Sequence, residues 1–400
     1  MSQGQRDGDG IVLPGIASVH SHAFQRALRG HGQALGNEAS FWSWRRAMYE
    51  LAGSVDPDAM GAIAEFAYAE LAKNGVSAVG EFHYVQHAPD GGAYDDRTIM
   101  AKAVIDAARR VGIRITLLRV VYERPGFGRD IEGVQRRFAD TPEQSIHDLG
   151  TLQAHYKDDP LVRFGIAPHS VRAVTRESLL TCHRYAAEHA LPFHVHVSEQ
   201  RREVRECIAE HGQRPVEYLH GLGAIDSRFV GVHATHLTDD ECAQLAPGFV
   251  ALCRTTERDL GDGLAPTDKI IRAGARLCFG VDSHALSDPF EEMRAAELDA
   301  RTLREARQVA LGGAELLRAS TEHGYTSIGW AGCHEEDRVV LDAHDPSLRG
   351  ATEATLGDAI AFGASGRATR EVKVAGKVLD FDIRALGDKF DAALKRIGFS

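Results

Sequence analysis

The sequence has few cysteines, and they show no motif spacing. Six cysteines occur in 400 residues, and none of them forms a CxxC pair. The first ten residues are polar and contain no hydrophobic core of a signal peptide. Together these features indicate a reduced, cytoplasmic setting.

Long apolar runs, basic stripes and repeats are also missing. No stretch of 18 consecutive apolar residues occurs, and a formal net charge of −11 with a mean hydropathy of −0.25 argues against a bilayer or a nucleic acid as partner. The absence of low-complexity tracts and of a fixed-period repeat argues against solenoids and disordered tails. A folded, soluble protein is expected, with no nucleic-acid or membrane partner.

Eight short β-branched or apolar runs alternate with amphipathic segments along the chain. This alternation predicts an α/β protein built on a (β/α)₈ TIM barrel. A barrel alone takes about 250 residues, so the remaining length leaves room for an appended module. The predicted strands are Ile16–Val19, Ser77–Phe82, Ile113–Val121, Val162–Ala167, Phe193–Val197, Phe229–Val232, Phe249–Cys253 and Leu277–Val281.

The chain beyond the eighth run predicts a small β module. A helical pattern continues from Ala306 to Ala319, and short strands are expected at Val339–Leu341, Ala359–Ala361 and Val372–Val378. The expected division of the chain is a barrel of residues 13–324, a small β module of residues 1–12 and 325–385, and a C-terminal helical tail of residues 386–400.

Metal-ligand residues stand at the ends of several predicted strands. His20 and His22 end the first strand, His196 ends the fifth, and Asp282 follows the eighth. Residues i and i+2 of a strand face the same way, so both histidines of the first pair can point at one cation. Because active sites of these barrels lie at the carboxyl ends of the strands, the four residues can converge on one metal. This pattern predicts a metal-dependent hydrolase, with His194 as a core histidine one layer deeper.

Several longer stretches of the sequence match a known enzyme family. The most specific are HSHAFQR at residues 20–26 and APHSVRAV at residues 167–174. Others are FWSWR at 41–45, EFHY at 81–84, HVHVSEQ at 194–200, VHATH at 232–236, TTERDLGDG at 255–263 and DSH at 282–284. Over about residues 11–380 the chain resembles the amidohydrolase superfamily, and within it the formimidoylglutamate deiminases of histidine breakdown. The resemblance implies an amidohydrolase-type TIM barrel with a small β-sandwich-like module formed from the chain termini.

The resemblance also implies a reaction, the hydrolysis of N-formimidoyl-L-glutamate to N-formyl-L-glutamate and ammonia. One divalent metal, usually Zn²⁺ with Fe²⁺ or Mn²⁺ as alternatives, would be held by the three histidines and Asp282 and would lower the pKa of bound water to about 7. Glu199 is expected to shuttle a proton from water to the leaving nitrogen. His233 would orient the hydroxide and stabilise the tetrahedral intermediate, and Asp282 would also act as an auxiliary base.

The same resemblance implies a small-molecule substrate with two carboxylates and a homodimeric assembly. Fixed cations and hydrogen-bond donors are needed at both carboxylates, and the positions that match are Gln25, Arg46, Tyr84, His169 and Arg172. Arg172 directly follows the fourth strand at the catalytic face, whereas Arg46 lies in a long insertion after the first strand.

Two features depart from the family pattern. About ten residues precede Ile11, whereas the family carries an N-terminal strand set that joins the C-terminal strands. The small sheet is therefore expected to be incomplete, with an unpaired edge that lowers solubility or stability. Arg254 follows Cys253 where a proline is expected, and this change could alter loop rigidity at the mouth of the seventh strand.

Three other functions are compatible with parts of this pattern. A deaminase of a heterocyclic amine such as guanine or cytosine would use the same metal site, but it needs an aromatic and amide pocket, and Arg46 and Arg172 favour a diacid. A non-catalytic binding protein on the same fold would be expected to lose the ligands, which are all present. A serine or cysteine acyl hydrolase is disfavoured because no GxSxG motif occurs.

Overall fold

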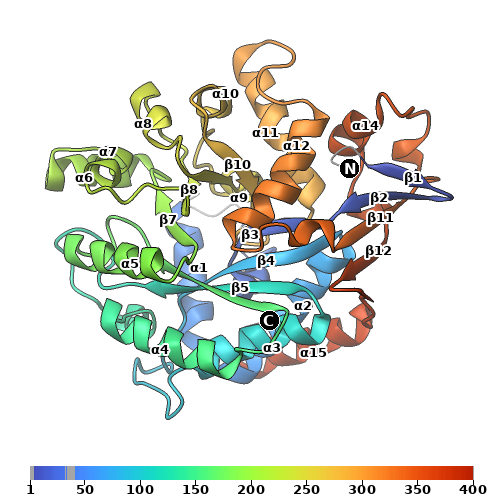
Figure 1. The fold of residues 1–400 in the computed structure, drawn as a ribbon. Helices are drawn as coiled ribbons and strands as arrows, with labels where there is room; N and C mark the ends of the chain where they lie inside the picture. The colour runs from blue at the N-terminus through green and yellow to red at the C-terminus, as the bar shows by residue number, and fades with distance from the viewer. Residues whose placement is uncertain (1–3, 32, 34–40, 400) are drawn as a thin grey trace.

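Eight parallel strands form a barrel in the computed structural model, which describes residues 4–31, 33 and 41–399 (Figure 1). Each strand pairs with the next along the chain, and every residue of the first three is buried, as expected for a parallel sheet covered by helices. The eight predicted strands are confirmed, with small shifts at their ends. They are β3 (Ile16–Ser21), β4 (Val76–His83), β5 (Arg114–Val121), β6 (Val162–Pro168), β7 (Phe193–Val197), β8 (Phe229–His233), β9 (Phe249–Leu252) and β10 (Arg276–Phe279).

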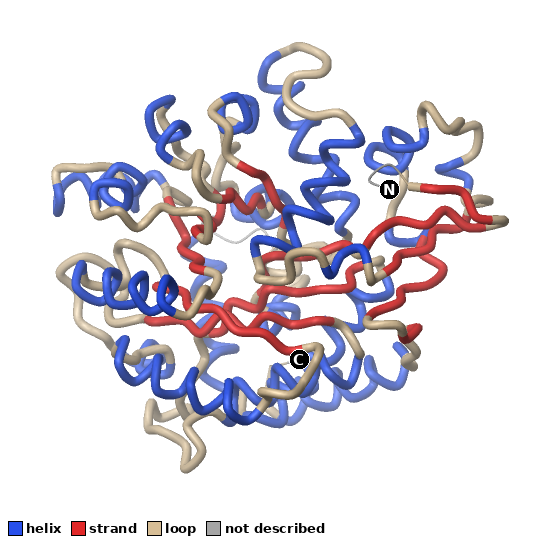
Figure 2. The backbone as a smooth tube through the Cα atoms, in the orientation of Figure 1, coloured by secondary structure: helices blue, strands red, loops and turns tan. Residues whose placement is uncertain are grey.

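Helices cover the outside of the barrel, as the blue tube around the red strands shows in Figure 2. Local sequence signals start several of them. The side chains of Asp56 and Thr141 accept a backbone N–H at the beginnings of α2 and α4, and a proline follows each. The helices up to the eighth strand are α1 (Phe41–Ser54), α2 (Pro57–Lys73), α3 (Ile99–Val111), α4 (Pro142–His155), α5 (Arg176–Glu188), α6 (Arg201–His211), α7 (Pro215–Gly221), α8 (Asp239–Gln244), α9 (Arg254–Leu260) and α10 (Thr267–Arg272), with 3₁₀ turns η1 (Ala23–Leu28) and η2 (Gly133–Arg137).

The barrel closes between its first and last strands through backbone hydrogen bonds. The N–H of His22 donates to the carbonyl oxygen of Asp282 over 2.9 Å, and the N–H of Asp282 donates to the carbonyl oxygen of His20 over 3.0 Å. Gly280 permits this approach, because a Cβ atom there would lie 2.8 Å from the backbone nitrogen of His20. Closure therefore places the ends of β3 and β10 side by side.

A second, antiparallel sheet joins the two ends of the chain (Figure 1). β11 (Arg338–Asp342) lies in its middle, paired with β2 (Gly10–Pro14) on one side and β12 (Thr369–Val374) on the other. β1 (Gln5–Asp7) extends the sheet beyond β2, and β13 (Lys377–Val378) extends it beyond β12. The expected unpaired edge beside β11 is therefore wrong, because the short segment before β3 supplies two strands.

The predicted strand at Ala359–Ala361 is wrong. These residues belong to the helix α14 (Leu356–Gly363). Leu356 and Ile360 are one turn apart and both are buried, so the segment packs one helical face. A run of three apolar residues has no periodicity that separates a strand from a helix, which is why the pattern was misread.

The predicted helical run from Ala306 to Ala319 is wrong over its first half. α11 (Pro289–Arg304) ends before it, and α12 (Gly313–Arg318) begins in its middle. Three successive backbone N–H groups of the intervening segment donate to the carboxylate of Glu297 over 2.8–2.9 Å. Their hydrogen-bonding capacity is thus satisfied without a helix. The chain continues through η3 (Ala319–His323), α13 (Gly324–Ser327) and η4 (Cys333–Glu335), with η5 (Pro346–Leu348) and η6 (Gly366–Ala368) further on.

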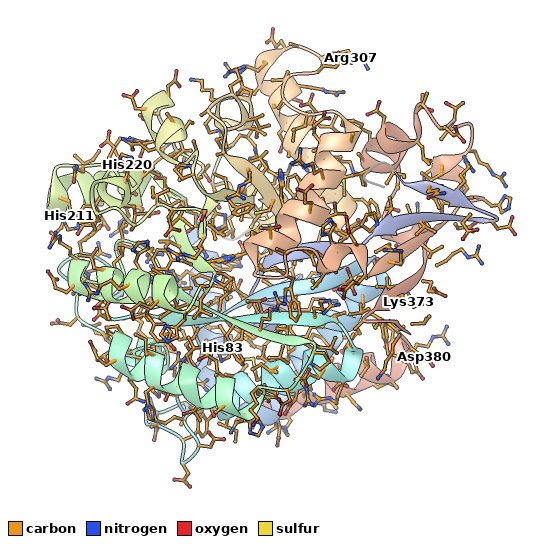
Figure 3. All side chains as sticks on the ribbon, in the orientation of Figure 1. His83, His211, His220, Arg307, Lys373 and Asp380 are labelled. Carbon is orange, nitrogen blue, oxygen red and sulfur yellow. The ribbon has the colours of Figure 1, made fainter. Side chains whose placement is uncertain are left out.

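The last residues of the chain return to the barrel surface. A turn at Ala375 separates β12 from β13, so the predicted strand Val372–Val378 is split in two. α15 (Ile383–Arg396) then packs on α2, and Arg396 pairs with Asp56 over 2.6 Å. Exposed charged residues such as Asp380 lie at the periphery in Figure 3. Among the described residues, no helix combines the length and apolar character needed to cross a membrane.

A buried ion pair ties the barrel to the small sheet, at the end of the barrel opposite the carboxyl ends of the strands. Arg114 begins β5, and its guanidinium donates to both oxygens of Asp337 over 2.8 and 3.0 Å. The same carboxylate accepts the hydroxyl of Tyr325 over 2.7 Å and the backbone N–H of Ala375 over 2.9 Å. Because Asp337 is fully buried, its negative charge holds three separate segments around Arg114.

Replacing Asp337 by Asn should destabilise the protein without altering the chemistry of the distant strand ends. The change leaves the buried Arg114 guanidinium with only the exposed carboxylate of Glu336 nearby, and about 3–5 kcal/mol of the free energy of unfolding should be lost. Glu336→Gln is the matched control, because that side chain is 66% exposed at 3.4 Å from the same guanidinium and should contribute at most about 1 kcal/mol. Urea unfolding measures both, and equal midpoints for the two variants would contradict this account.

Candidate active site

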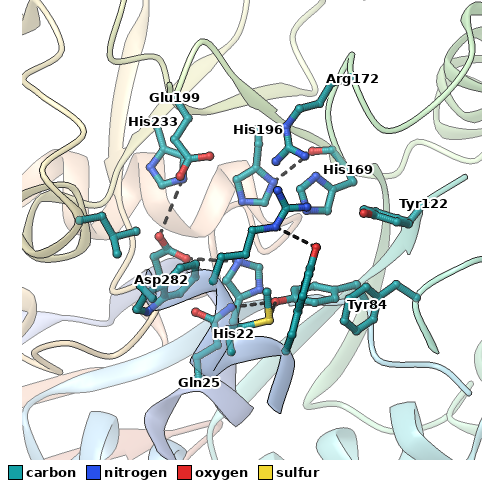
Figure 4. A pocket seen from close by; sticks show the side chains of 16 residues that line it. His22, Gln25, Tyr84, Tyr122, His169, Arg172, His196, Glu199, His233 and Asp282 are labelled. Atoms are coloured by element: carbon teal, nitrogen blue, oxygen red, sulfur yellow. Dashed lines mark hydrogen bonds and ion pairs between the residues drawn. The ribbon is translucent and has the colours of Figure 1, made fainter. Parts of the chain in front are cut away.

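A cavity of about 610 Å³ opens at the carboxyl ends of the barrel strands (Figure 4). Its wall is built from strand ends, the residues that follow them, and one face of α1. Imidazoles, carboxylates, arginines and phenol rings all reach it. The lining side chains are His22, Gln25, Trp44, Arg45, Met48, Tyr49, Tyr84, Tyr122, Phe138, His169, Arg172, His196, Glu199, His233, Leu260 and Asp282.

The four residues predicted as metal ligands converge in one cluster. Ring nitrogens of His20, His22 and His196 lie within 4.8 Å of one another, and the Nε2 atoms of His20 and His196 are 3.1 Å apart. Oδ1 of Asp282 lies 3.2 Å from Nε2 of His22 and 3.6 Å from Nε2 of His20. All four side chains are buried. The structure therefore brings these residues together from β3, β7 and the segment after β10.

The hydrogen bonds of these rings leave lone pairs directed at the cluster. Nδ1 of His22 donates to the carbonyl oxygen of Phe82 over 2.9 Å, and Nδ1 of His196 donates to that of His169 over 3.1 Å, so each Nε2 stays unprotonated in the neutral ring. Burial lowers the pKa of His22 to about 3, and burial with neighbouring imidazoles holds the pKa of His20 and of His196 well below the ordinary value. Three neutral imidazoles beside one carboxylate are a donor set that fits a single divalent cation.

Asp282 connects the imidazole cluster to the rest of the cavity. Its φ of 52° lies in the left-handed region, which a non-glycine residue adopts at a cost and which recurs at functional sites. Burial raises the pKa of Asp282 to about 7; the charge of His233 opposes the rise, and that of Glu199 adds to it. A cation beside this carboxylate would favour its ionised form.

Glu199 and His233, the predicted catalytic residues, face Asp282 (Figure 4). Nε2 of His233 lies 3.8 Å from Oδ2 of Asp282 and 4.0 Å from Oε1 of Glu199. Burial disfavours a charge on His233, but the carboxylates of Glu199, Glu257 and Asp282 outweigh it and raise its pKa to about 10. The three predicted catalytic side chains therefore meet at one point, with the imidazole of His233 between two carboxylates.

A carboxylate that the sequence did not single out holds the loop bearing Glu199. The two oxygens of Glu203, in the first turn of α6, accept the backbone N–H groups of Ser198 and Glu199 over 3.2 and 3.1 Å. Ser198 itself has a left-handed φ of 53°. Burial raises the pKa of Glu203 to about 7, and the charge of Arg172 opposes the rise. The backbone that directs Glu199 is thus fixed from the following helix.

Four of the five predicted substrate-binding residues line the opposite wall. Nε2 of Gln25 donates to the hydroxyl of Tyr84 over 2.8 Å, and both side chains are buried. The ring of His169 stacks on that of His196 with centroids 4.8 Å apart. Figure 4 shows Arg172, His169 and Tyr84 on the side of His196 away from the catalytic residues. The wall offers cationic, amide and phenol groups to a ligand that reaches the imidazole cluster.

Arg46, the fifth predicted residue, does not belong to this wall. It is exposed on α1 and lines an adjoining outer cavity of about 990 Å³. Arg45 lines the main cavity instead, and its Nε donates to the hydroxyl of Tyr49 over 2.8 Å. Because residue 46 is turned by about 100° around the helix axis from residue 45, only one of the two can face inward. The geometry therefore places Arg45, and not Arg46, in the main cavity.

Seven residues that line the cavity are not among the predicted site residues, and for two of them a sequence signal exists. Arg45 shares a helical face with Met48, which is buried, whereas Arg46 shares one with Glu50, which is exposed. Applying this periodicity to α1 selects the inward arginine. Tyr122 directly follows β5, at the carboxyl end where barrel strands carry their functional side chains.

Two further histidines near the strand ends lie outside the cavity. Nε2 of His194 bonds the carbonyl oxygen of Ser327 over 3.0 Å in the barrel interior, as expected of a core histidine. Nε2 of His284 lies 2.9 Å from the hydroxyl of Ser21, which donates to Glu81 over 2.7 Å. These bonds support the end of β3, which carries two of the cluster's imidazoles.

Comparison with known proteins agrees with this geometry. The model of the amidohydrolase family matches residues 11–378. The chain belongs to the amidohydrolase family. The family predicted from the motifs is thereby confirmed.

Similar amidohydrolases include two enzymes and one solved structure. A formimidoylglutamate deiminase of Pseudomonas aeruginosa is 38% identical over 405 residues, covering 96% of this chain and 87% of that protein. A 5-methylthioadenosine/S-adenosylhomocysteine deaminase of Nitratidesulfovibrio vulgaris is 27% identical and covers 94% of this chain and 81% of that protein. The crystal structure of an amidohydrolase from Brucella melitensis has a TM-score of 0.89 at 30% identity, covering 98% and 95% of the two chains.

The imidazole cluster should bind about one divalent cation per chain, and the two histidines of β7 should differ in their importance for it. His196→Asn removes a nitrogen of the cluster and should leave little metal after dialysis. His194→Asn is the matched control, because that ring bonds Ser327 instead, and it should retain about one equivalent. Elemental analysis of both purified variants measures the metal that each retains. Equal metal contents would show that the imidazole cluster is not the metal site.

Proposed function

We propose that this amidohydrolase hydrolyses N-formimidoyl-L-glutamate to N-formyl-L-glutamate and ammonia. The observation that carries the proposal is the placement of two arginines, Arg45 and Arg172, in the one cavity that also holds the imidazole cluster. Two guanidinium groups match a substrate with two carboxylates, each of which a guanidinium can bind through paired hydrogen bonds. The similarity to the formimidoylglutamate deiminase of Pseudomonas aeruginosa supports the same assignment.

The proposed cofactor is one Zn²⁺ ion held by His20, His22, His196 and Asp282. Three imidazole nitrogens and one carboxylate oxygen suit zinc in a catalytic site, and Fe²⁺ and Mn²⁺ accept the same donors. A cation bound there would lower the pKa of a water molecule to about 7 and supply hydroxide near neutral pH.

Glu199 is proposed to move the protons that the reaction requires. Water adds to the formimidoyl carbon, the bond from that carbon to the terminal nitrogen breaks, and the nitrogen leaves as ammonia. Both protons of the attacking water end on the terminal imino nitrogen, which leaves as ammonia, so a carboxylate within reach of both atoms can transfer them in turn. Glu199 lines the cavity 4.0 Å from His233, and its backbone N–H is held by Glu203.

His233 and Asp282 are proposed to assist this transfer. The ring of His233 lines the cavity with Nε2 toward Glu199 and Asp282, where it would orient the attacking oxygen and stabilise charge in the tetrahedral intermediate. Asp282 would accept a proton as auxiliary base. On the opposite wall, Arg45 and Arg172 would bind the two carboxylates of the glutamate portion, and Gln25, Tyr84 and His169 would orient it by hydrogen bonds.

Assembly and location are separate proposals. A homodimer in the cytoplasm is what the family resemblance implies, and a small molecule is the only partner that the proposed reaction needs. Sedimentation velocity of the purified chain would measure the assembly directly.

A product assay tests the reaction. Zinc-loaded protein given N-formimidoyl-L-glutamate should release ammonia and N-formylglutamate in equal amounts. Glu199→Gln should lower kcat by about 10²–10⁴-fold while retaining its metal, because it removes only the proton carrier. Formamide as a product would mean that the other C–N bond breaks, and full activity of Glu199→Gln would refute its role.

The same assay separates the proposed function from a heterocyclic deaminase. Phenol rings of Tyr84 and Tyr122 line the cavity and offer faces on which a purine can stack. Ammonia release from 5-methylthioadenosine in place of formimidoylglutamate would establish that alternative.

The two neighbouring arginines of α1 should affect substrate binding very differently. Arg45→Met removes a charged hydrogen-bond donor from the cavity and should raise KM for N-formimidoyl-L-glutamate by about 10–150-fold. Arg46→Met changes an exposed residue outside that cavity and should leave KM within about twofold. Steady-state kinetics of the pair provides the comparison, and the opposite ranking would restore Arg46 as the substrate-binding residue.

A further inference from the structure

Arg254 occupies the position where the family resemblance predicts a proline, and the structure gives it a definite environment. It is the first residue of α9, directly after β9, and it is fully buried. Such burial of a guanidinium requires a counter-charge and hydrogen-bond acceptors within the protein. The effect of Arg254 on this loop therefore depends on the groups that its charge holds in place.

The guanidinium of Arg254 pairs with a carboxylate on its own helix. Nη1 donates to Oε2 of Glu257 over 3.0 Å, while Nη2 donates to the hydroxyl of Thr267 over 2.7 Å and to the carbonyl oxygen of Ala265 over 3.3 Å. Glu257 is also fully buried. Burial by itself raises the pKa of Glu257, but the charge of Arg254 and the bond to His233 outweigh burial, and the pKa of this carboxyl lies below its ordinary value.

The other oxygen of Glu257 reaches the cavity histidine. Oε1 accepts the backbone N–H of Cys253 over 2.9 Å and lies 3.4 Å from Nδ1 of His233. Because an ionised carboxylate only accepts hydrogen bonds, Nδ1 must carry a proton to bond it. The opposite ring nitrogen, Nε2, then faces Glu199 and Asp282 at 4.0 and 3.8 Å.

The backbone at His233 gives a second reason why this ring needs support. His233 and Ala234 have φ values of 69° and 50°, both in the left-handed region. Two successive non-glycine residues in this region carry a conformational cost that the surrounding structure must overcome. Burial of His233 against Glu257 supplies a fixed contact at this turn.

We propose that Glu257 and Arg254 are positioning residues for His233: Glu257 holds the proton of His233 on Nδ1 and aims Nε2 into the cavity, and Arg254 keeps Glu257 ionised. This inference deepens the proposed function and rests on it for the role of His233. Neither residue lines the cavity. A carboxylate that orients a histidine in this way affects the chemical step more than substrate binding.

If Arg254 has a purely structural role, the variants should behave differently. Its bonds to Thr267 and Ala265 join α9 to the start of α10, and this link has nothing to do with His233. If that link were its whole contribution, the effects of Arg254 and Glu257 on kcat would be independent. If Arg254 acts through Glu257, replacing Arg254 lowers kcat no further once Glu257 has been replaced.

The test uses three variants of the metal-loaded enzyme: Glu257→Gln, Arg254→Met and the double variant. Arg258→Met is the matched control, because Arg258 lies on the same helix but pairs with Glu291 and Asp299 at the surface. Each protein is assayed for kcat and KM with N-formimidoyl-L-glutamate, for metal content, and for its melting temperature. Nitrogen NMR of ¹⁵N-histidine-labelled protein, with the His233 signals assigned from His233→Asn, reports the state of each ring nitrogen.

Glu257→Gln should lower kcat by about 10–100-fold, with KM within about threefold and about one equivalent of metal retained. Its spectrum should show a changed Nδ1–H signal of His233, because the carboxylate that accepts this proton has become an amide. Arg254→Met should lower kcat to a similar extent, and the double variant should be no worse than Glu257→Gln alone. Arg254→Lys, which keeps the charge, should recover most of the loss, and Arg258→Met should match the wild type.

Two results would overturn the proposal. One is an unchanged Nδ1–H signal of His233 in Glu257→Gln; the other is a double variant in which the two losses multiply. Should Arg254→Met fail to fold, the near-isosteric Glu257→Gln still decides through the NMR signal. The NMR measurement needs no substrate, so it stands even if the wild-type protein does not hydrolyse formimidoylglutamate, and failure of the proposed function is thereby distinguished from failure of the positioning.

Discussion

The closure of the barrel between β3 and β10 is the constraint on which the site depends. Two backbone hydrogen bonds link Asp282 to His20 and His22, so the interaction that completes the barrel also brings three members of the imidazole and carboxylate cluster together. The close approach at Gly280 is part of the same constraint, because a side chain there would meet the backbone of His20. A larger residue at 280 would therefore disturb fold and site at once, which separates this glycine from those in surface turns.

The catalytic side chains are aimed by helices that follow the strands, and this arrangement repeats at two places. Glu203 of α6 accepts backbone N–H groups of the loop that bears Glu199, and Glu257 of α9 bonds the ring of His233. In both cases a carboxylate near the start of a helix extends back to a strand end. The repeating strand and helix units of the barrel thus provide the supports as well as the functional residues, and the cavity needs no separate scaffold.

The parts of the structure that could be predicted from sequence are those that depend on local pattern. The eight strands follow from apolar runs, and the cluster follows from histidines and an aspartate placed at strand ends. Arg46 was selected from a motif position without the helical phase of α1, and that phase places Arg45 rather than Arg46 in the main cavity. Glu257 could not be found in this way, because its partner His233 lies 24 residues away and only the neighbouring positions of β8 and β9 bring them together. Interactions between units of a barrel leave no periodic signal in either unit.

The distribution of charge around the cavity explains why the buried carboxylates differ. Glu257 lies beside Arg254, and its pKa is lowered in spite of burial. Asp262 and Asp282 have no such arginine, so burial dominates and their pKa values rise to about 9 and about 7, with Glu199 adding to both. Arg254 thus offsets the burial of Glu257, whereas the carboxylate beside the imidazoles is left to a ligand. A divalent cation is the group that those neutral rings select, and its charge would stabilise Asp282 in the form that binds it.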